Sequence, residues 1–459
     1  MAHKKEMNEN RPLPDSEGGQ KVSEQAAVLV PDEQERTAIQ SFLAADAVPT
    51  ALQNLIEQYI VRKIDKDWHD PVILDRIRRA IVTQKIRYWN EKAKKPITYK
   101  GGYSVIAYLA YQFPVYYLQF ASIFSELAAA GLLKKEMVIV DAGSGPGVVP
   151  LAVIDLMKRL HGCHATIHAI EQSEEHREAY RYLVEGYGKE VPAVTLTPPM
   201  NKDITKVKPE DLPVSIDLLV FSNVLNELHE SSIQDRADLI RRWTSRLAPD
   251  GIILLIEPAE RVASSALRKT TQMLAAAGLT VYSPCPDLWR SRCSCQDCWT
   301  FEERRSIRPT HLMEVLADDP EGYRYLNTDI KFSSAIIRMD KKTRTRFEPL
   351  SEKKYARFSH LASHENHRVS CAAMKMSADL GDPKNHVFLL CDGTSPVPVF
   401  AVLPAYHETE ENRAIRTCGY GEGMVLQGVL VRQNRKTGAY NLLISKQSRA
   451  IPFQQDLEN

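Results

Sequence analysis

Residues 137–147 read MVIVDAGSGPG, and this stretch decides the fold. An apolar run that ends near Asp141 and leads into closely spaced glycines is typical of a buried strand that turns sharply into a helix. From here to about residue 340, apolar runs of strand length alternate with segments of helical periodicity. This alternation predicts an α/β domain built on a doubly wound parallel sheet.

The expected elements of this domain can be placed by number. We expect strands over residues 137–143, 165–171, 193–198, 216–223, 251–258, 279–284 and 331–340. We expect helices between them over residues 149–160, 173–187, 231–247 and 263–277. The long gap before the last strand contains a cysteine-rich segment, which we interpret as an insertion.

The chain is helical before this sheet and strand-like after it. Several aromatic side chains fall in one strongly apolar helical stretch and are expected to be core: Tyr108, Tyr111, Phe113, Tyr116, Tyr117 and Phe120. After residue 340 a charged linker leads to short strand-like runs over residues 357–362, 368–376, 386–393, 398–404, 423–434 and 439–448. Strands of this length and number fit a small barrel of the oligonucleotide-binding (OB) type.

The predicted organisation therefore has distinct parts along the chain. They are a disordered tail (1–36), a helical N-terminal domain (37–135), the sheet domain (136–340) with a metal-binding insertion (284–330), a basic linker (341–355) and an OB-like β-barrel (356–459).

Composition limits the classes of function. The chain has 459 residues, with 59 Lys and Arg against 58 Asp and Glu, so a globally basic nucleic-acid coat is excluded but local patches are not. It has no apolar run long enough for a membrane span and no apolar signal core, so we expect a cytoplasmic protein without membrane contacts. No DNA partner is expected.

The glycine loop indicates the ligand of the sheet domain. Its spacing is Gly143-x-Gly145-x-Gly147, which differs from the G-x-G-x-x-G of nicotinamide binders. Asp141 precedes the loop, where class I S-adenosylmethionine (SAM) methyltransferases carry an acid that faces the methionine end of the ligand. Further polar residues follow the next strands: Glu171 suited to the ribose hydroxyls, Asp203 to the adenine amino group, and Asn223 to the reactive end. SAM is therefore the expected cofactor.

The methyl acceptor is not encoded in a recognisable motif. The fourth strand ends in SNVLNELHE and lacks the Asn-Pro-Pro-aromatic run that suits methylation of base amino groups. Glu227 and His229 could act as acid or base, but a polar helix start that caps locally explains them better. Methyl transfer from a sulfonium mainly needs the donor and the acceptor to be aligned, so the missing motif does not exclude catalysis. No catalytic residue is assigned.

Four cysteines lie within fourteen residues of the insertion: Cys285, Cys293, Cys295 and Cys298. Four thiolates suit a [4Fe-4S] cluster or tetrahedral zinc, and we favour the cluster because paired C-x2-C hairpins are missing. Cys391 is an alternative ligand in place of Cys293 or Cys295, and free buried cysteines are the plain alternative. Since Cys285 follows the carboxyl end of a strand, the metal loop is expected beside the SAM pocket.

Together these pieces resemble the methyltransferase-like proteins of the mitochondrial small ribosomal subunit and their prokaryotic relatives. The similarity is carried by VDAGSGPG (140–147), SNVLNEL (222–228), IEP (256–258), the Cys285-Pro pair and KFSSAIIR (331–338). The resemblance implies a SAM-type fold, a [4Fe-4S] cluster and action on small-subunit ribosomal RNA during assembly, with ribosomal proteins as further partners. Cys293-Ser-Cys295 is tighter than the cysteine spacing of that family.

Three hypotheses follow for function. The first is a SAM-dependent methyltransferase acting on ribosomal RNA, suggested by the loop and Glu171. The second is a non-catalytic, RNA-binding assembly factor with a structural or redox-sensing metal site, suggested by the barrel and the basic linker. The third and weakest is methylation of a small molecule.

Overall fold

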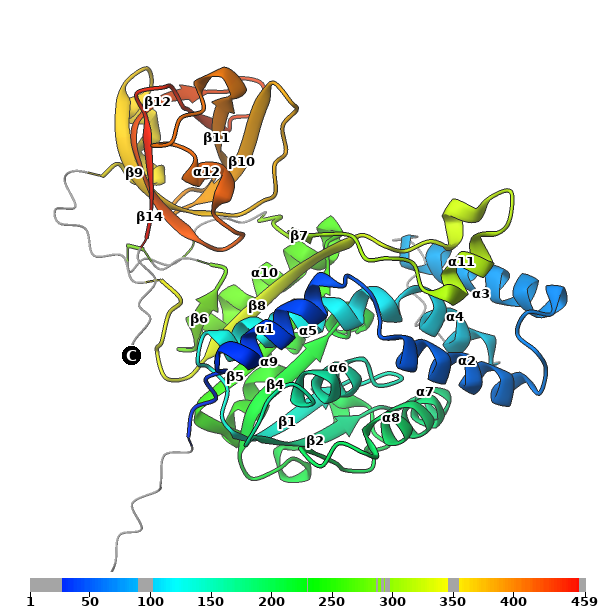
Figure 1. Cartoon of the computed structure of the whole chain (residues 1–459). Coiled ribbons are helices and arrows are strands. Elements are labelled where there is room, and N and C mark those ends of the chain that lie inside the picture. The colour runs from blue at the N-terminus through cyan, green and yellow to red at the C-terminus, as the bar shows by residue number, and fades with distance from the viewer. Residues whose placement is uncertain are drawn as a thin grey trace, which may run out of the picture.

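The computed structural model describes residues 27–89, 102–228, 230–285, 288–289, 293, 298–345 and 355–453. The predicted tail up to residue 26 and most of the linker therefore lie outside the described residues. Helices and a central sheet form one body, and the C-terminal barrel stands beside the edge of that sheet where β6 and β8 lie (Figure 1).

The central sheet has eight strands in the order β3-β2-β1-β4-β5-β8-β6, with β7 paired to β8. Its first five strands are parallel, and β8 runs antiparallel to β5, β6 and β7. The strands are β1 Glu136–Ala142, β2 His164–Ile170, β3 Val194–Leu196, β4 Ile216–Ser222, β5 Leu247–Pro258, β6 Thr280–Ser283, β7 Glu302–Arg304 and β8 Ile330–Arg338. This is the strand order of class I SAM methyltransferases, so the predicted fold is confirmed.

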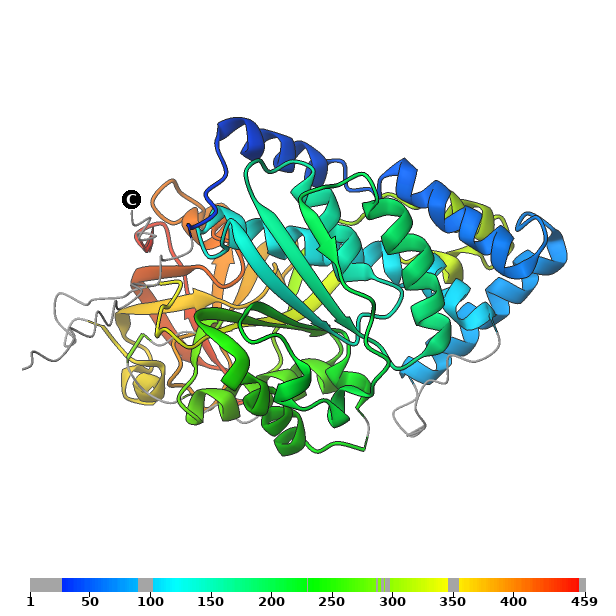
Figure 2. The same cartoon turned by 90° about the horizontal axis from the view of Figure 1, so that it is seen from below.

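Both faces of the sheet are buried, which explains its continuous apolar strands. Successive side chains of β1 point to opposite faces, so Ile139 joins one hydrophobic core and Val140 joins the other. Figure 2 shows the N-terminal helices and the helices α9 (Ile233–Trp243) and α10 (Arg261–Ala276) on opposite sides. Helix α6 (Val148–Met157) lies between the sheet and the N-terminal helices and is buried along its whole length.

The N-terminal helices are α1 Glu33–Ala44, α2 Thr50–Ile64, α3 Pro71–Trp89, α4 Tyr103–Tyr111 and α5 Phe113–Ala129. Asp32 begins α1 through a capping box with Glu35. Helices α4 and α5 are apolar on most sides because they pack between the outer helices and the sheet, and one hydrophobic core runs through all three layers. The aromatic residues Phe113, Tyr117 and Phe120 belong to this core, as expected, and are fully buried.

The insertion between β6 and β8 has two described parts with different neighbours. Its first part, around Leu288 and Trp289, packs on the barrel residues Met374 and Met376. Its second part contains β7 and the helix α11 (His311–Ala317), which returns to the N-terminal helices. There Arg78 Nε donates to the Leu316 carbonyl over 3.0 Å. None of the described insertion residues lines the pocket at the strand ends, and the expectation of a metal loop beside that pocket stays a prediction.

The C-terminal unit is a closed five-stranded barrel with one added strand. Its strands are β9 Arg368–Lys375, β10 Asn385–Cys391, β11 Val399–Pro404, β12 Gly423–Gln433, β13 Tyr440–Leu443 and β14 Arg449–Pro452. The ring β9-β10-β11-β13-β12 closes through a parallel β11–β13 pair and the antiparallel β12–β9 pair. This is an OB-type barrel, as predicted.

One predicted barrel strand is wrong. Residues 357–362 lie instead in a 3₁₀ helix, Phe358–His364, whose Phe358 and Leu361 are buried. Their spacing of three residues matches one 3₁₀ turn and places both on one side, where they enter the barrel core. The strand β14 was not expected because it is only four residues long. Within the described ranges, no helix combines the length and apolarity that a membrane crossing requires.

Candidate functional site

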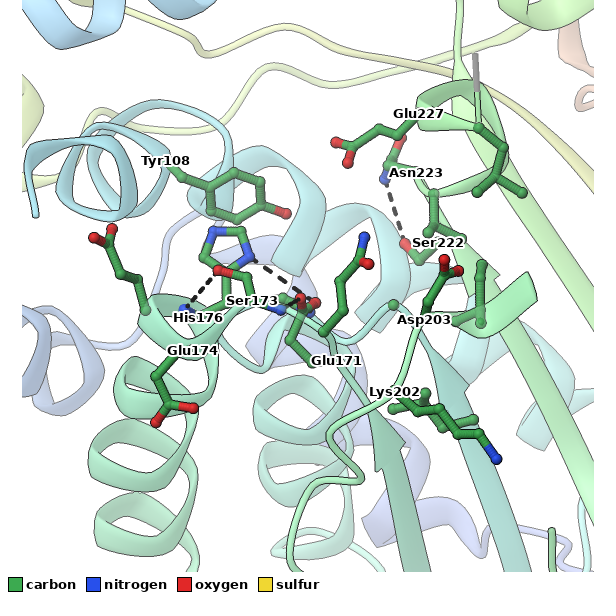
Figure 3. Close-up of a pocket in the computed structure, with 18 residues that line it drawn as sticks. Tyr108, Glu171, Ser173, Glu174, His176, Lys202, Asp203, Ser222, Asn223 and Glu227 are labelled. Carbon is green, nitrogen blue, oxygen red and sulfur yellow. Dashed lines mark hydrogen bonds and ion pairs between the residues drawn. The ribbon is translucent and has the colours of Figure 1, made fainter. Parts of the chain in front are cut away.

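A cavity of about 590 Å³ opens at the carboxyl ends of β1, β2 and β4. That edge of an open α/β sheet is where ligands bind, and the volume is in the range of small-molecule sites, roughly 300–1,000 Å³. The cavity is lined by Tyr108, Gly143, Gly145, Ile170, Glu171, Gln172, Ser173, Glu174, Glu175, His176, Lys202, Asp203, Ile204, Ser222, Asn223, Val224, Glu227 and Leu228 (Figure 3). Five of the seven predicted ligand-binding residues are in this set, and Asp141 and Gly147 are not.

The glycine loop passes where side chains do not fit. At Gly143 an added Cβ would lie 2.4 Å from Val224 Cγ2, and at Gly147 it would lie 2.2 Å from Val184 Cγ2. Gly147 has φ 99° and is the N-cap residue of α6, so it serves the turn into the helix and does not contact the cavity. Gly145, by contrast, borders the cavity directly.

Glu171 ends β2 with an ionised, oriented carboxylate. Its Oε2 accepts a hydrogen bond from Gly145 N over 2.9 Å, and its Oε1 accepts one from Ser173 N over 2.6 Å. Burial pushes the pKa of Glu171 upward, but His176 and the two backbone N–H groups outweigh burial and bring the pKa below its usual value. Because a carboxylate oxygen has two lone pairs, both oxygens can still accept hydroxyl protons from a ligand.

Three buried oxygen atoms at or next to the strand ends that border the cavity have no hydrogen-bond partner among the described residues. They are Asp141 Oδ2, Ser144 Oγ and Asn223 Oδ1. Burial, together with the charge of Glu171, raises the pKa of Asp141 well above its usual value. Asn223 has φ 54°, a left-handed conformation that is uncommon outside glycine and that concentrates at functional sites. Buried polar groups are rarely left unpaired in native proteins, so these atoms require a ligand or water.

Asp203 lines the cavity but also caps a turn. Its Oδ1 accepts hydrogen bonds from Thr205 N over 2.9 Å and from Thr205 Oγ1 over 2.8 Å. Its other oxygen, Oδ2, lies 3.8 Å from Lys206 Nζ. The carboxylate therefore has a structural role in addition to any contact with a ligand.

Glu227 faces the cavity from the turn Leu225–Glu227, on the side opposite Glu171 (Figure 3). It is a candidate for an acid or base at the cavity. His229 lies outside the described residues.

Among the cavity residues that sequence reasoning missed are His176 and Tyr108. His176 lies on the first turn of α7 (Glu174–Tyr180), where Ser173 caps the helix, and its Nδ1 is 3.9 Å from Glu171 Oε2. Tyr108 comes from α4, and its ring centroid is 5.5 Å from that of His176 (Figure 3). The interval Glu171-x4-His176 was a local signal for the histidine. Tyr108 had no such signal, because it is part of an aromatic helix that is otherwise core.

Glu257 holds the turn that carries Glu227. It is 2% exposed at the end of β5. Its Oε1 accepts a hydrogen bond from Leu225 N over 3.0 Å, and its Oε2 accepts one from Asn226 N over 3.0 Å. Burial raises the pKa of Glu257 to about 8, although the two N–H groups and Arg236 act in the opposite direction.

We expect Glu257 to make folding stability depend on pH. Between its usual pKa of 4.5 and about 8, the folded state binds a proton on Glu257 that the unfolded chain has released. The unfolding free energy should therefore fall as pH rises, by up to about 1.4 kcal/mol per pH unit from this group. Urea unfolding at pH 5.5, 6.5 and 7.5 measures the slope. Glu257→Gln should lower the unfolding free energy equally at all three pH values and should remove the contribution of Glu257 to its pH dependence. Equal pH dependence of the unfolding free energy in the wild type and the variant would contradict the raised pKa of Glu257.

The four described cysteines of interest lie near the contact between insertion and barrel, and we call Cys285, Cys293, Cys298 and Cys391 the thiol site. Burial raises the pKa of Cys391 well above its usual value, and the charges of Cys285 and Cys293 add to the rise. Cys391 lies at the end of β10 and packs against the cluster that contains Trp289. Cys295 lies outside the described residues. Of the predicted ligands, the structure thus brings Cys285 and Cys293 toward Cys391.

Two N–H groups are directed at sulfur atoms of the thiol site. Gly393 N donates a hydrogen bond to Cys391 Sγ over 3.4 Å. Gln272 Nε2 donates a hydrogen bond to Cys293 Sγ, also over 3.4 Å. Hydrogen bonds to sulfur and a nearby positive charge stabilise thiolates that bind a metal. Among the described residues, no three His, Cys, Asp or Glu side chains are arranged tightly enough to hold a metal ion. The chemistry of the donors fits a cluster, and the ligand geometry is not formed.

The fold and site define a class I methyltransferase-like protein with an added barrel. The family described as mitochondrial small ribosomal subunit Rsm22 matches residues 102–351, more than half of the chain, and the chain belongs to this family. Residues 359–453 match the C-terminal domain of a domain of unknown function, DUF8157. No curated protein matches the chain significantly.

Solved methyltransferase structures are similar to part of the chain. Magnesium protoporphyrin IX methyltransferase from Synechocystis PCC 6803 with bound SAM is 13% identical over 56% of this chain and 96% of its own, with TM-score 0.30. A SAM-dependent methyltransferase from Leishmania major is 15% identical over 48% of this chain and 78% of its own, with TM-score 0.28. The mitomycin 7-O-methyltransferase MmcR is 17% identical over 56% of this chain and 70% of its own, with TM-score 0.29.

Proposed function

We propose that this protein binds SAM in the cavity at the strand ends and acts on the RNA of the small ribosomal subunit during its assembly. The observation that carries the first part is the set of unpaired buried oxygens beside an oriented Glu171 carboxylate. Membership of the Rsm22 family supports the second part. The cytoplasmic location expected from the sequence stays a prediction.

Each polar group of the cavity has a counterpart in SAM. Glu171 would accept the two ribose hydroxyl protons, because its oxygens are ionised and held by Gly145 N and Ser173 N. Asp141 and Asn223 would pair with the ammonium of the methionine end, and Asp203 with the adenine amino group. SAM supplies an activated methyl group on a sulfonium. The residues of the chain bind and align this donor, and Tyr108 covers the cavity from α4.

The thiol site is proposed to hold a [4Fe-4S] cluster, with zinc as the alternative. The proposed ligand set is Cys285, Cys293, Cys298 and Cys391, with Cys391 in place of Cys295. Support comes from the shared location of these thiols and from the N–H groups directed at two of their sulfurs. Such a cluster would join the insertion to the barrel, since Cys391 belongs to β10.

A specific observation favours the second candidate function, a non-catalytic assembly factor. Among the described residues, the cavity wall carries five carboxylates, namely Glu171, Glu174, Glu175, Asp203 and Glu227, and one lysine, Lys202. A field of this sign attracts a sulfonium and repels phosphates. RNA that remains outside the cavity could be bound by the barrel without receiving a methyl group.

One experiment separates the two candidates. Purified protein is incubated with small-subunit RNA and SAM labelled on its methyl group, and RNA binding is measured across a series of salt concentrations. We expect RNA affinity to fall with salt, with a log–log slope of roughly −0.7 per phosphate contact on single strands. Label on the RNA assigns the enzyme, and salt-dependent binding without label assigns the assembly factor.

Gly145→Asp is the control for the donor site. A Cβ at Gly145 would lie 3.8 Å from His176 Nδ1, so the new carboxylate would enter the cavity next to Glu171. We expect this variant to lose SAM binding and any methyl transfer while its RNA binding is unchanged. Salt-independent or absent RNA affinity in both proteins, with no labelled RNA, would exclude both candidates.

A further inference from the structure

One row of side chains on α10 faces the cysteine segment. Ser264, Arg268 and Gln272 are spaced by four residues and therefore lie along one side of the helix. Ser264 Oγ donates to the Thr300 carbonyl over 2.9 Å, and Gln272 Nε2 donates to Cys293 Sγ over 3.4 Å. Arg268 lies between them, so its guanidinium is held over the same segment.

Arg268 is fully enclosed at a junction of three parts of the chain. It is only 2% exposed. Its Nη1 donates to the Ser334 carbonyl of β8 over 2.7 Å, and its Nη2 donates to Tyr420 Oη of the barrel unit over 3.0 Å. Its Nε is buried and has no hydrogen-bond partner among the described residues. A buried guanidinium usually has a compensating negative charge, and these neighbours are neutral.

Thr300 is the second connection at this junction. It follows Cys298 by two residues, and its hydroxyl donates to the Met376 carbonyl of the barrel unit over 2.6 Å. Its carbonyl accepts from Ser264 and Ser333 over 2.9 and 2.8 Å. The backbone beside Cys298 is thus tied to the sheet body and to the barrel at once.

The barrel also packs against the residue before Cys285. At Gly421, next to Tyr420, an added Cβ would lie 3.3 Å from Pro284 Cβ. Pro284, which precedes Cys285, and Thr300, which follows Cys298 by two residues, therefore both border the place where Arg268 and Tyr420 meet.

We propose that Arg268 is a positioning residue of the thiol site, where its guanidinium balances the negative charge of a thiolate-bound metal centre and fastens that centre to the barrel through Tyr420. This inference rests on the proposed metal centre. It explains why an arginine that has no carboxylate partner among the described residues is buried here. It also links metal binding to the docking of the barrel, because the same guanidinium serves both.

The test uses full-length protein prepared without oxygen, in the wild-type form and as Arg268→Met, Arg268→Lys and Tyr420→Phe. Iron and zinc are counted per chain, and the midpoint potential of an iron centre is measured by redox titration. Loss of a buried positive charge disfavours the more negative reduced state. We expect Arg268→Met to shift the one-electron equilibrium about tenfold toward the oxidised form, which is a potential lower by 59 mV. If the metal is zinc, chelator competition should show about tenfold weaker binding.

The remaining variants separate charge from packing. Arg268→Lys keeps the charge and should restore most of the potential or affinity, whereas Tyr420→Phe should leave both nearly unchanged. Both variants should speed hydrogen exchange in residues 374–376 and 418–424, where the barrel meets the insertion. Lys269→Met is the matched control, because Lys269 is the exposed neighbour on the same helix. A metal-loaded wild type with an indistinguishable Arg268→Met variant would overturn this inference alone. A wild type without metal would overturn the proposed centre together with it.

Discussion

Glu171→Ala is expected to weaken SAM binding about 100-fold. Two hydrogen bonds from ribose hydroxyls to an ionised carboxylate contribute about 1.5–3 kcal/mol each, and part of this is recovered by water in the variant. The loss of the acceptor for Gly145 N and Ser173 N also loosens the loop that lines the cavity. Isothermal titration calorimetry with SAM measures the change, and a thermal melt reports whether the variant is still folded.

Glu174→Ala provides the matched control for this prediction. Glu174 lines the same cavity but pairs with Arg177 and Arg181, and Figure 3 shows its carboxylate directed away from Glu171. We expect its SAM affinity to stay within about twofold of the wild type, as for most exposed ion pairs. Equal affinities for the Glu171 and Glu174 variants would mean that the ligand does not bind through the end of β2.

Cys391→Ala is expected to reduce bound metal to less than about a tenth of the wild-type content, because a four-thiolate site rarely survives the loss of one ligand. Cys285→Ala should do the same. The measurement is the iron and zinc content per chain after anaerobic purification, together with the absorption spectrum. A change at Cys391 is the more informative of the two, since this residue is about a hundred positions away from the other ligands in sequence.

Cys163→Ala is the control for metal binding, because Cys163 is buried against the sheet body, in a hydrophobic core that does not include the thiol site. It should retain the wild-type metal content. Separate Cys293→Ala and Cys295→Ala variants then identify the spare cysteine, and we expect Cys295 to be spare. If Cys391→Ala keeps its full metal content and Cys295→Ala loses it, the ligands are instead the four cysteines of the insertion.

Much of the sheet domain was predictable because its signals are local. The strand expected over residues 165–171 is β2 His164–Ile170, and the strand expected over 216–223 is β4 Ile216–Ser222. Apolar runs of this kind are unambiguous when both faces of a sheet are buried. The helix α11 was missed because its seven residues are too few for a periodic pattern, and it is stabilised by Arg78 from a distant helix.

The candidate site was predictable where its residues follow strand ends and not where they come from other layers. Asp141, Glu171 and Asn223 could be placed because the ends of neighbouring parallel strands meet at one edge. Tyr108 could not, since it shares its apolar helical pattern with Phe113 and Tyr117, which are core. The neighbourhood of Cys391 likewise depends on how the barrel packs on the insertion, which no local spacing encodes.

The continuous core that joins the N-terminal helices to the sheet has a practical consequence for how the protein can be divided. A fragment that begins at Glu136 would expose the apolar side of α6 and remove Tyr108 from the cavity, so it should be insoluble and unable to retain a donor. The smallest useful fragment therefore starts before Asp32, because the segment that looks like an accessory extension supplies part of the core and of the cavity wall.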